Sequence, residues 1–281
     1  MSMYDANSFS PRLPAKERRL RVHVPDKHNP KLQAIMEAVR RDDELYALWH
    51  AQNVTAVVRL NMTDHGPVHV HLVANMALRM LRILVERGIQ PSIVRDYGFT
   101  PDDAEVVVVL AALLHDVGMS IHRANHEEYS LIIANRKLDD LLPVAYPSPD
   151  VRTLIKSEIL HAIIAHRKGG KPLTLEAGIV RVADALDMTE GRSRIPFERG
   201  STSIHAVSAL AIRKVEIQEG KEKPVLVHIQ MCNEAGVFQI DALLREKLQG
   251  SGLEPYVQII ARITPQDPSC PEEVMLREII L

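Results

Sequence analysis

The stretch VVVVLAALLHDVG, residues 106–118, ends a long apolar run with two adjacent metal-ligating side chains, His115 and Asp116. Burying an imidazole and a carboxylate side by side costs several kcal/mol unless a positive charge lies between them. A divalent metal ion would offset that cost. The pair is therefore the first candidate for a functional site, and the apolar run before it predicts an element of the core.

The segment that leads to this pair is predicted to be a helix. Thr100 can cap it, Pro101 suits its first turn, and the two aspartates that follow favour the positive end of the helix dipole. The valines at 106–109 taken alone would indicate a buried strand, but the cap and the length of the segment favour a helix. We therefore expect a buried helix that presents the His-Asp pair at its end.

The chain around this helix divides into a helical part and a mixed part. Apolar residues at three- and four-residue spacing predict helices over residues 31–41, 43–59, 68–87, 150–167 and 173–187, with another through Leu131 and Ile133. The period then shortens to two, which predicts strands over residues 209–218, 225–231 and 256–263 and a helix over residues 239–248. The expected fold class is mainly α, with a helical domain at residues 31–200 and a small α+β unit at residues 201–281.

Residues 1–30 are interrupted by prolines and carry a mildly basic run. They are expected to form an extended N-terminal arm, most simply a solvated tail.

Composition limits the possible partners. The 281 residues are 46% apolar, which is enough for a sizeable core, and the net charge of −2 provides no overall field for nucleic acid or an anionic membrane. Cys232 and Cys270 lack CxxC spacing, which argues against a zinc ribbon or a disulfide scaffold. With no leader-like start and no run of about 18 apolar residues, we expect a cytoplasmic protein without a membrane segment.

Histidines are concentrated in residues 65–166, so we expect the functional site in this part of the chain. The ordered set His69, His115, Asp116 and Asp184, the last in VADALD, resembles the His…His-Asp…Asp signature of the HD-domain superfamily of metal-dependent phosphohydrolases. The resemblance covers about residues 60–190. It implies an all-α fold in which these four residues ligate one metal ion and Asp116 can bridge to a second.

The same resemblance implies that His126 and His166 hold a second ion, roughly 3.5–4 Å from the first. Mixed imidazole and carboxylate ligands suit Mn, Fe, Co, Ni or Zn better than Ca. His65 precedes His69 by one helical turn and is a weaker candidate ligand. Asp187 is a rival to Asp184 but is expected to be an exposed or capping residue.

Catalysis and phosphate binding have their own candidates. Asp116 could orient the attacking water, and His122 or His161 could protonate the leaving oxygen instead of serving as an outer contact. Cations near the proposed site are candidates for holding a phosphate, although a solvated basic turn explains the HRKGGK loop equally well; they are Arg123, Arg167, Lys168, Lys171, Arg192 and Arg194.

These observations favour a metal-dependent phosphohydrolase that cleaves a phosphomonoester or a cyclic phosphodiester, with a small nucleotide-like substrate and one or two divalent ions. The alternative is a regulatory module that binds metal and nucleotide with weak or no turnover. A nuclease-like role is disfavoured, because the chain has no basic stripe and only 4% aromatic residues. The strands of the C-terminal unit would be covered in a homo-oligomer, which we expect.

Overall fold

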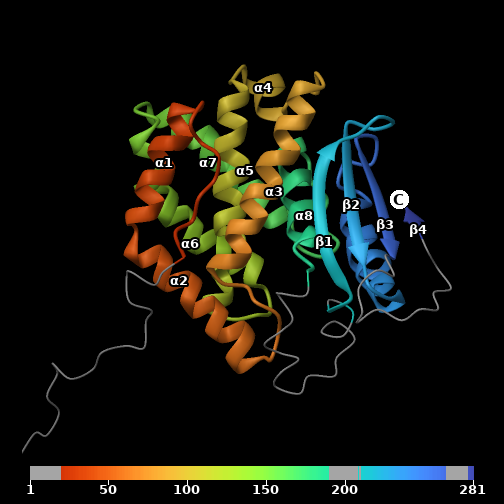
Figure 1. Ribbon diagram of the computed structural model, residues 1–281. Coiled ribbons are helices and arrows are strands. Elements are labelled where there is room, and N and C mark those ends of the chain that lie inside the picture. Colours follow the sequence, from red (N-terminus) through yellow and green to blue (C-terminus); the bar gives the residue numbers. More distant parts are fainter. Residues whose placement is uncertain (1–19, 190–207, 209, 264–277) are drawn as a thin grey trace, which may run out of the picture.

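The computed structural model describes residues 20–189, 208, 210–263 and 278–281. Its larger part is a bundle of helices, and the smaller part is a sheet that lies against one side of the bundle (Figure 1). The helices of the bundle are α1 (Pro30–Arg41), α2 (Asp43–Asn53), α3 (Pro67–Glu86), α4 (Ser92–Tyr97), α5 (Pro101–Leu114), α6 (His126–Leu141), α7 (Pro149–Ala165) and α8 (Leu175–Leu186). Short turns join them at η2 (Val54–Arg59), η3 (Val117–Ser120) and η4 (Leu142–Val144).

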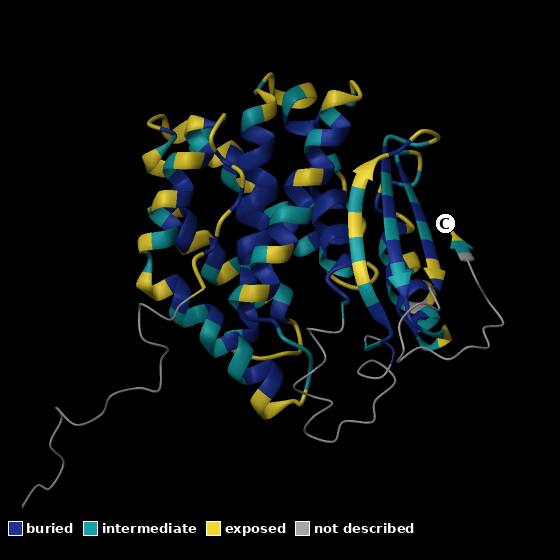
Figure 2. Ribbon diagram, in the orientation of Figure 1, coloured by how far each residue is buried: buried dark blue, intermediate teal, exposed yellow. Residues whose placement is uncertain are grey.

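Helix α5 is the centre of the bundle. It packs against α3, α7 and α8, and Figure 2 shows it buried along its length. Its N-terminus has the predicted cap, because Asp103 accepts hydrogen bonds from the backbone N–H and the hydroxyl of Thr100. At its other end the buried indole of Trp49 donates to the Leu113 carbonyl over 2.9 Å. Both ends of α5 are therefore fixed, and the residues that follow Leu114 have a defined place.

The C-terminal unit is a four-stranded sheet in the order β1-β2-β3-β4. Its strands are β1 (Ile212–Glu219), β2 (Val225–Met231), β3 (Val257–Ile263) and β4 (Glu278–Ile280). Strands β2 and β3 pair in parallel, so the chain must cross over between them, and it does so through η5 (Glu234–Gly236), η6 (Gln239–Leu244) and α11 (Arg245–Leu248). Both η6 and α11 contact α8, which places this crossover on the helical domain.

The predicted fold class, mainly α with a C-terminal α+β unit, is confirmed. The structure adds α4 and β4, which are too short for a periodic pattern to reveal. The predicted boundary near residue 200 lies outside the described residues. The solvated-tail interpretation of residues 1–30 is wrong for the described residues 20–29, because Val22 and Val24 are fully buried and Arg40 donates to the Val22 carbonyl.

Helix α3 is long and apolar enough to cross a membrane by length and composition, which is weak evidence by itself. More than half of its most apolar window is buried within the protein. This is the pattern of a core helix, and α3 contacts α5 and α8 on the inner side of the bundle.

Candidate metal centre

Imidazole and carboxylate groups from five helices meet at one end of α5. His69 lies in the first turn of α3, and His115 and Asp116 follow the last residue of α5. His126 is the first residue of α6, His166 follows α7, and Asp184 lies near the end of α8. The structure thus brings all six predicted ligands into one cluster.

The first group of donor atoms consists of His69, His115, Asp116 and Asp184. The Nε2 atoms of the two histidines are 3.2 Å apart. Oδ1 of Asp184 lies 3.5 and 3.6 Å from them, and Oδ2 of Asp116 lies 3.5 and 3.4 Å from them. An ion with four ligand bonds of about 2.1 Å in a tetrahedron separates its ligand atoms by roughly 3.4 Å. The donor set therefore fits a divalent transition-metal ion.

The second group lies on the other side of Asp116. The Oδ1 atom of Asp116 is 3.0 Å from Nε2 of His126 and 3.7 Å from Nε2 of His166. Glu127 also has a carboxylate oxygen close to His126 and His166. The two oxygens of Asp116 thus face two different histidine pairs, as a carboxylate shared between two ions would.

Hydrogen bonds at Nδ1 explain which ring atom His69, His115 and His166 turn to the cluster. Nδ1 lies 2.6 Å from Asp187 Oδ2 in His69, 2.8 Å from the Ala112 carbonyl in His115 and 2.5 Å from the Ile163 carbonyl in His166. These partners can only accept, so each Nδ1 carries a hydrogen. Nε2 is then the atom that can offer a lone pair to a metal ion.

A family comparison agrees with this geometry. The family model described as HD domain matches residues 68–189, which contain all six residues of the cluster. The chain is also 41% identical over 239 residues to uncharacterized protein MJ1020 of Methanocaldococcus jannaschii, across 85% of this chain and 91% of that protein. The chain belongs to the HD domain family. No solved structure matches it in a structure search.

The carboxylates of the HD domain cluster shift the pKa values of the neighbouring histidines. Burial alone would lower the pKa of His115, but Asp116 and Asp184 outweigh it and raise the pKa to about 10. Burial would also lower the pKa of His126, but Asp116 and Glu127 outweigh it and raise the pKa to about 9. The carboxylates therefore draw protons into the site when no other cation is bound, and a metal ion would replace those protons.

His166 behaves differently, because burial and its positive neighbours both lower its pKa. Burial, and then the charges of His115 and Lys247, lower its pKa to about 3. A neutral imidazole is the form that binds a metal ion. His166 is thus ready to act as a ligand without losing a proton.

The remaining predicted site residues lie around the cluster or away from it. His122 is exposed and accepts from the Ala124 N–H, whereas Nε2 of His161 accepts from the Leu173 N–H. Neither of these contacts brings the ring to the six-residue cluster, and their role as proton donors stays a prediction. His65 is mostly buried, with its ring 5.3 Å from that of His69 and its Nδ1 2.7 Å from the Thr63 carbonyl.

Of the predicted phosphate-binding cations, Arg123 comes nearest to a ligand, since its guanidinium lies 2.7 Å from Nδ1 of His126. Arg167 pairs with Glu128 over 3.4 Å, and Lys168 and Lys171 are exposed in the turn after α7. Arg192 and Arg194 lie outside the described residues.

Sequence reasoning did not assign three residues at the site their observed roles. Asp187 was expected to be exposed or capping; it does cap the C-terminus of α8, but it is buried, and its carboxylate bonds His69. Its spacing of three residues from Asp184 was the available signal. Lys247 and Arg181 carry no pattern that marks them, because their contacts join the helical domain to the C-terminal unit.

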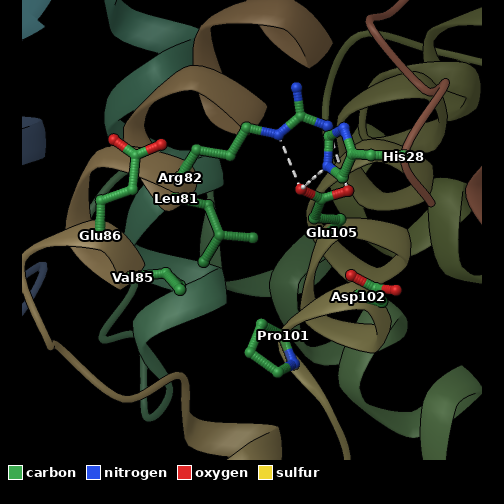
Figure 3. A pocket seen from close by; sticks show the side chains of 8 residues that line it. All are labelled: His28, Leu81, Arg82, Val85, Glu86, Pro101, Asp102 and Glu105. Atoms are coloured by element: carbon green, nitrogen blue, oxygen red, sulfur yellow. Dashed lines mark hydrogen bonds and ion pairs between the residues drawn. The ribbon is translucent and has the colours of Figure 1, made fainter.

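A cavity of about 390 Å³ lies at the opposite end of α5 (Figure 3). Glu105 forms its polar wall and accepts from Arg82 over 2.7 Å, from Asn29 over 2.9 Å and from His28 over 3.2 Å. Glu105, the cavity residue nearest to His115 along α5, lies about 15 Å from it along the helix axis. The cavity is therefore distinct from the metal centre, and its ion pair holds the N-terminal segment against α3 and α5.

Proposed function

We propose that this protein is a metal-dependent phosphohydrolase that cleaves a phosphomonoester or a cyclic phosphodiester of a small, nucleotide-like molecule. The observation that carries the proposal is the position of Asp116, whose two oxygens face two separate histidine pairs within 3.0–3.7 Å. Sites that hold two ions about 3.5–4 Å apart are typical of phosphoester hydrolysis.

Each residue of the cluster has a distinct task in this proposal. His69, His115 and Asp184 would hold one ion, His126 and His166 the other, and Asp116 both. Divalent ions bound there would lower the pKa of water and neutralise the charge that develops on the phosphoryl oxygens. Mn, Fe, Co, Ni and Zn are the candidates, because each accepts mixed imidazole and carboxylate ligands.

The partial exposure of the cluster supports a hydrolytic role over a purely structural one, because a substrate needs access to the ions. The side chains of His69 and His115 have no exposed surface, whereas 17% of the Asp184 side chain is exposed. A small substrate would therefore approach from the Asp184 side. We also propose a cytoplasmic location, a nucleotide-like substrate and a homo-oligomeric assembly. The metal analysis described next tests the metal centre independently of these three parts of the proposal.

The test starts with the metal content of the purified protein. We expect about two divalent ions per chain after reloading of metal-free protein with each candidate metal, and turnover of at least one member of a panel of phosphomonoesters and cyclic phosphodiesters. Asp116→Asn removes the shared charge, so metal binding and turnover should both be lost.

Asp139→Asn is the matched control, because Asp139 is 65% exposed on α6 and pairs only with Lys156 among the described residues. It should keep both properties. A protein that binds no divalent ion at all would refute the proposal. Tight metal and nucleotide binding without turnover of any panel member would favour the alternative, a regulatory module.

A further inference from the structure

Lys247 belongs to the C-terminal unit, yet its ammonium group lies at the metal centre. The side chain extends from α11, and Nζ is 3.3 Å from Oδ2 of Asp184. Nζ also donates to the carbonyl oxygen of His166. One lysine therefore contacts two residues of the cluster, which come from the ends of α7 and α8.

The backbone of Lys247 is held in place by Arg181, a fully buried residue of α8. Nε of Arg181 donates to the Lys247 carbonyl over 3.0 Å, and its NH2 group donates to the carbonyl and the carboxylate of Glu246, each over 3.2 Å. The same guanidinium donates to the carbonyl of Arg167, next to His166. Lys247 is thus fixed at its backbone and at its ammonium group, so its position does not depend on a flexible side chain.

The charge of Lys247 is unfavourable for metal binding. An ammonium group beside Asp184 repels a divalent ion held by the other oxygen of the same carboxylate. Metal-ligating side chains ordinarily have hydrogen-bond partners of their own, as Asp187 supports His69, but a neutral donor would support Asp184 without this repulsion. A cation at this position needs another explanation.

An approaching anion provides that explanation. Lysine has three N–H donors, and among the described residues the ammonium group has two acceptors, Asp184 and the His166 carbonyl. The contacting side chains of Lys247 and Asp184 are each 17% exposed, so solvent reaches both. Among the residues that the structure describes, no acceptor takes the third N–H, which leaves it to a group that enters from solvent.

We propose that Lys247 binds a phosphoryl oxygen of the substrate beside the metal ions, an inference that rests on the proposed function. The C-terminal unit thereby supplies a substrate-binding residue to the HD domain. Two of the described cations near the cluster have other partners, because Arg123 contacts His126 and Arg167 pairs with Glu128.

The experiment measures two affinities of the full chain by calorimetry, one for Mn²⁺ and one for inorganic phosphate added to the Mn²⁺-loaded protein. In Lys247→Met, phosphate should bind about 10- to 100-fold more weakly, the range for loss of a charged hydrogen bond. Mn²⁺ should bind with unchanged or higher affinity, because a repulsive charge has been removed. A merely structural role would weaken both.

Arg245→Met is the matched control. It removes a cation of the same helix whose side chain is 45% exposed and paired with Asp241, so both affinities should equal those of the unsubstituted protein. If Lys247→Met fails to fold, Lys247→Gln, which keeps a neutral donor, takes its place. We again expect weaker phosphate binding together with unchanged or higher Mn²⁺ affinity.

Equal phosphate affinity in the lysine variants and the unsubstituted protein overturns the inference and leaves the proposed function intact. A parallel loss of Mn²⁺ and phosphate affinity also overturns it, since Lys247 would then act only on the ligands. An unsubstituted protein that binds no Mn²⁺, Fe²⁺, Co²⁺, Ni²⁺ or Zn²⁺ refutes the proposed function itself, and the inference with it.

Discussion

Asp187 should control metal affinity although it is not itself in the ligand cluster. Its carboxylate lies 2.6 Å from Nδ1 of His69, and only 4% of its side chain is exposed. This bond fixes the ring so that Nε2 faces His115. Loss of such a supporting partner typically costs 10- to 100-fold in metal affinity, or about 1.4–2.7 kcal/mol.

Two substitutions of Asp187 should lower the metal affinity to different extents. Asp187→Asn keeps a carbonyl acceptor of the same shape but loses the charge, so we expect about a tenfold loss. Asp187→Ala removes the acceptor and frees the ring to rotate, so we expect a loss of about 100-fold. The assay is competition with a chromophoric chelator, using metal-free protein whose folding is first checked by thermal unfolding.

The exposed Asp139 again provides the control, because Asp139→Asn makes the same chemical change on α6. The reasoning is refuted if Asp187→Ala competes for metal as well as the unsubstituted protein does. It is also refuted if Asp187→Asn is the weaker binder of the two, because the ranking follows directly from the acceptor at Nδ1.

Three other predictions concern the support of the site. Gly118→Ala would place a Cβ 2.0 Å from the His126 carbonyl oxygen, so the start of α6 must shift. The number of bound ions per chain, measured by elemental analysis, should fall from two to one, and an unchanged number would contradict this. Arg181→Met leaves backbone carbonyls without their buried donor and should cost about 3–5 kcal/mol in urea unfolding, whereas a loss under about 1 kcal/mol would show that the cation is dispensable. Burial alone would raise the pKa of Asp103, but its bonds, from Lys31 first, lower it. The carboxylate therefore stabilises the fold above the unfolded-state pKa of about 3.9, and this contribution is lost as pH falls through the folded-state value. Asp103→Asn should thus be less stable than the unsubstituted protein near neutral pH, with a gap that closes in acid; a gap that is constant with pH would contradict this.

Sequence reasoning succeeded where local chemistry decides the structure. The cap at Thr100, the proline after it and the apolar run predict α5. The meeting of His69, His115, Asp116 and Asp184 is implied by the resemblance of their order to the HD-domain signature. These signals work because a helix end fixes where its next residues point.

It failed where a contact depends on how distant segments dock. Lys247 is 63 residues from Asp184, and only the crossover between β2 and β3 brings them together. Val22 and Val24 form too short a pattern to predict burial, and the orientation of Asp187 depends on where α8 ends. Such positions follow from packing rather than from periodicity.

The bond between Trp49 and the Leu113 carbonyl has a practical consequence. The chain has one tryptophan, so its tryptophan emission arises from a single indole on α2, which bonds a carbonyl two residues before His115. Its wavelength and intensity depend on whether this end of the helix stays packed and dry. The protein thus contains its own optical probe, and unlabelled samples can be titrated in a fluorimeter to follow events at the neighbouring cluster.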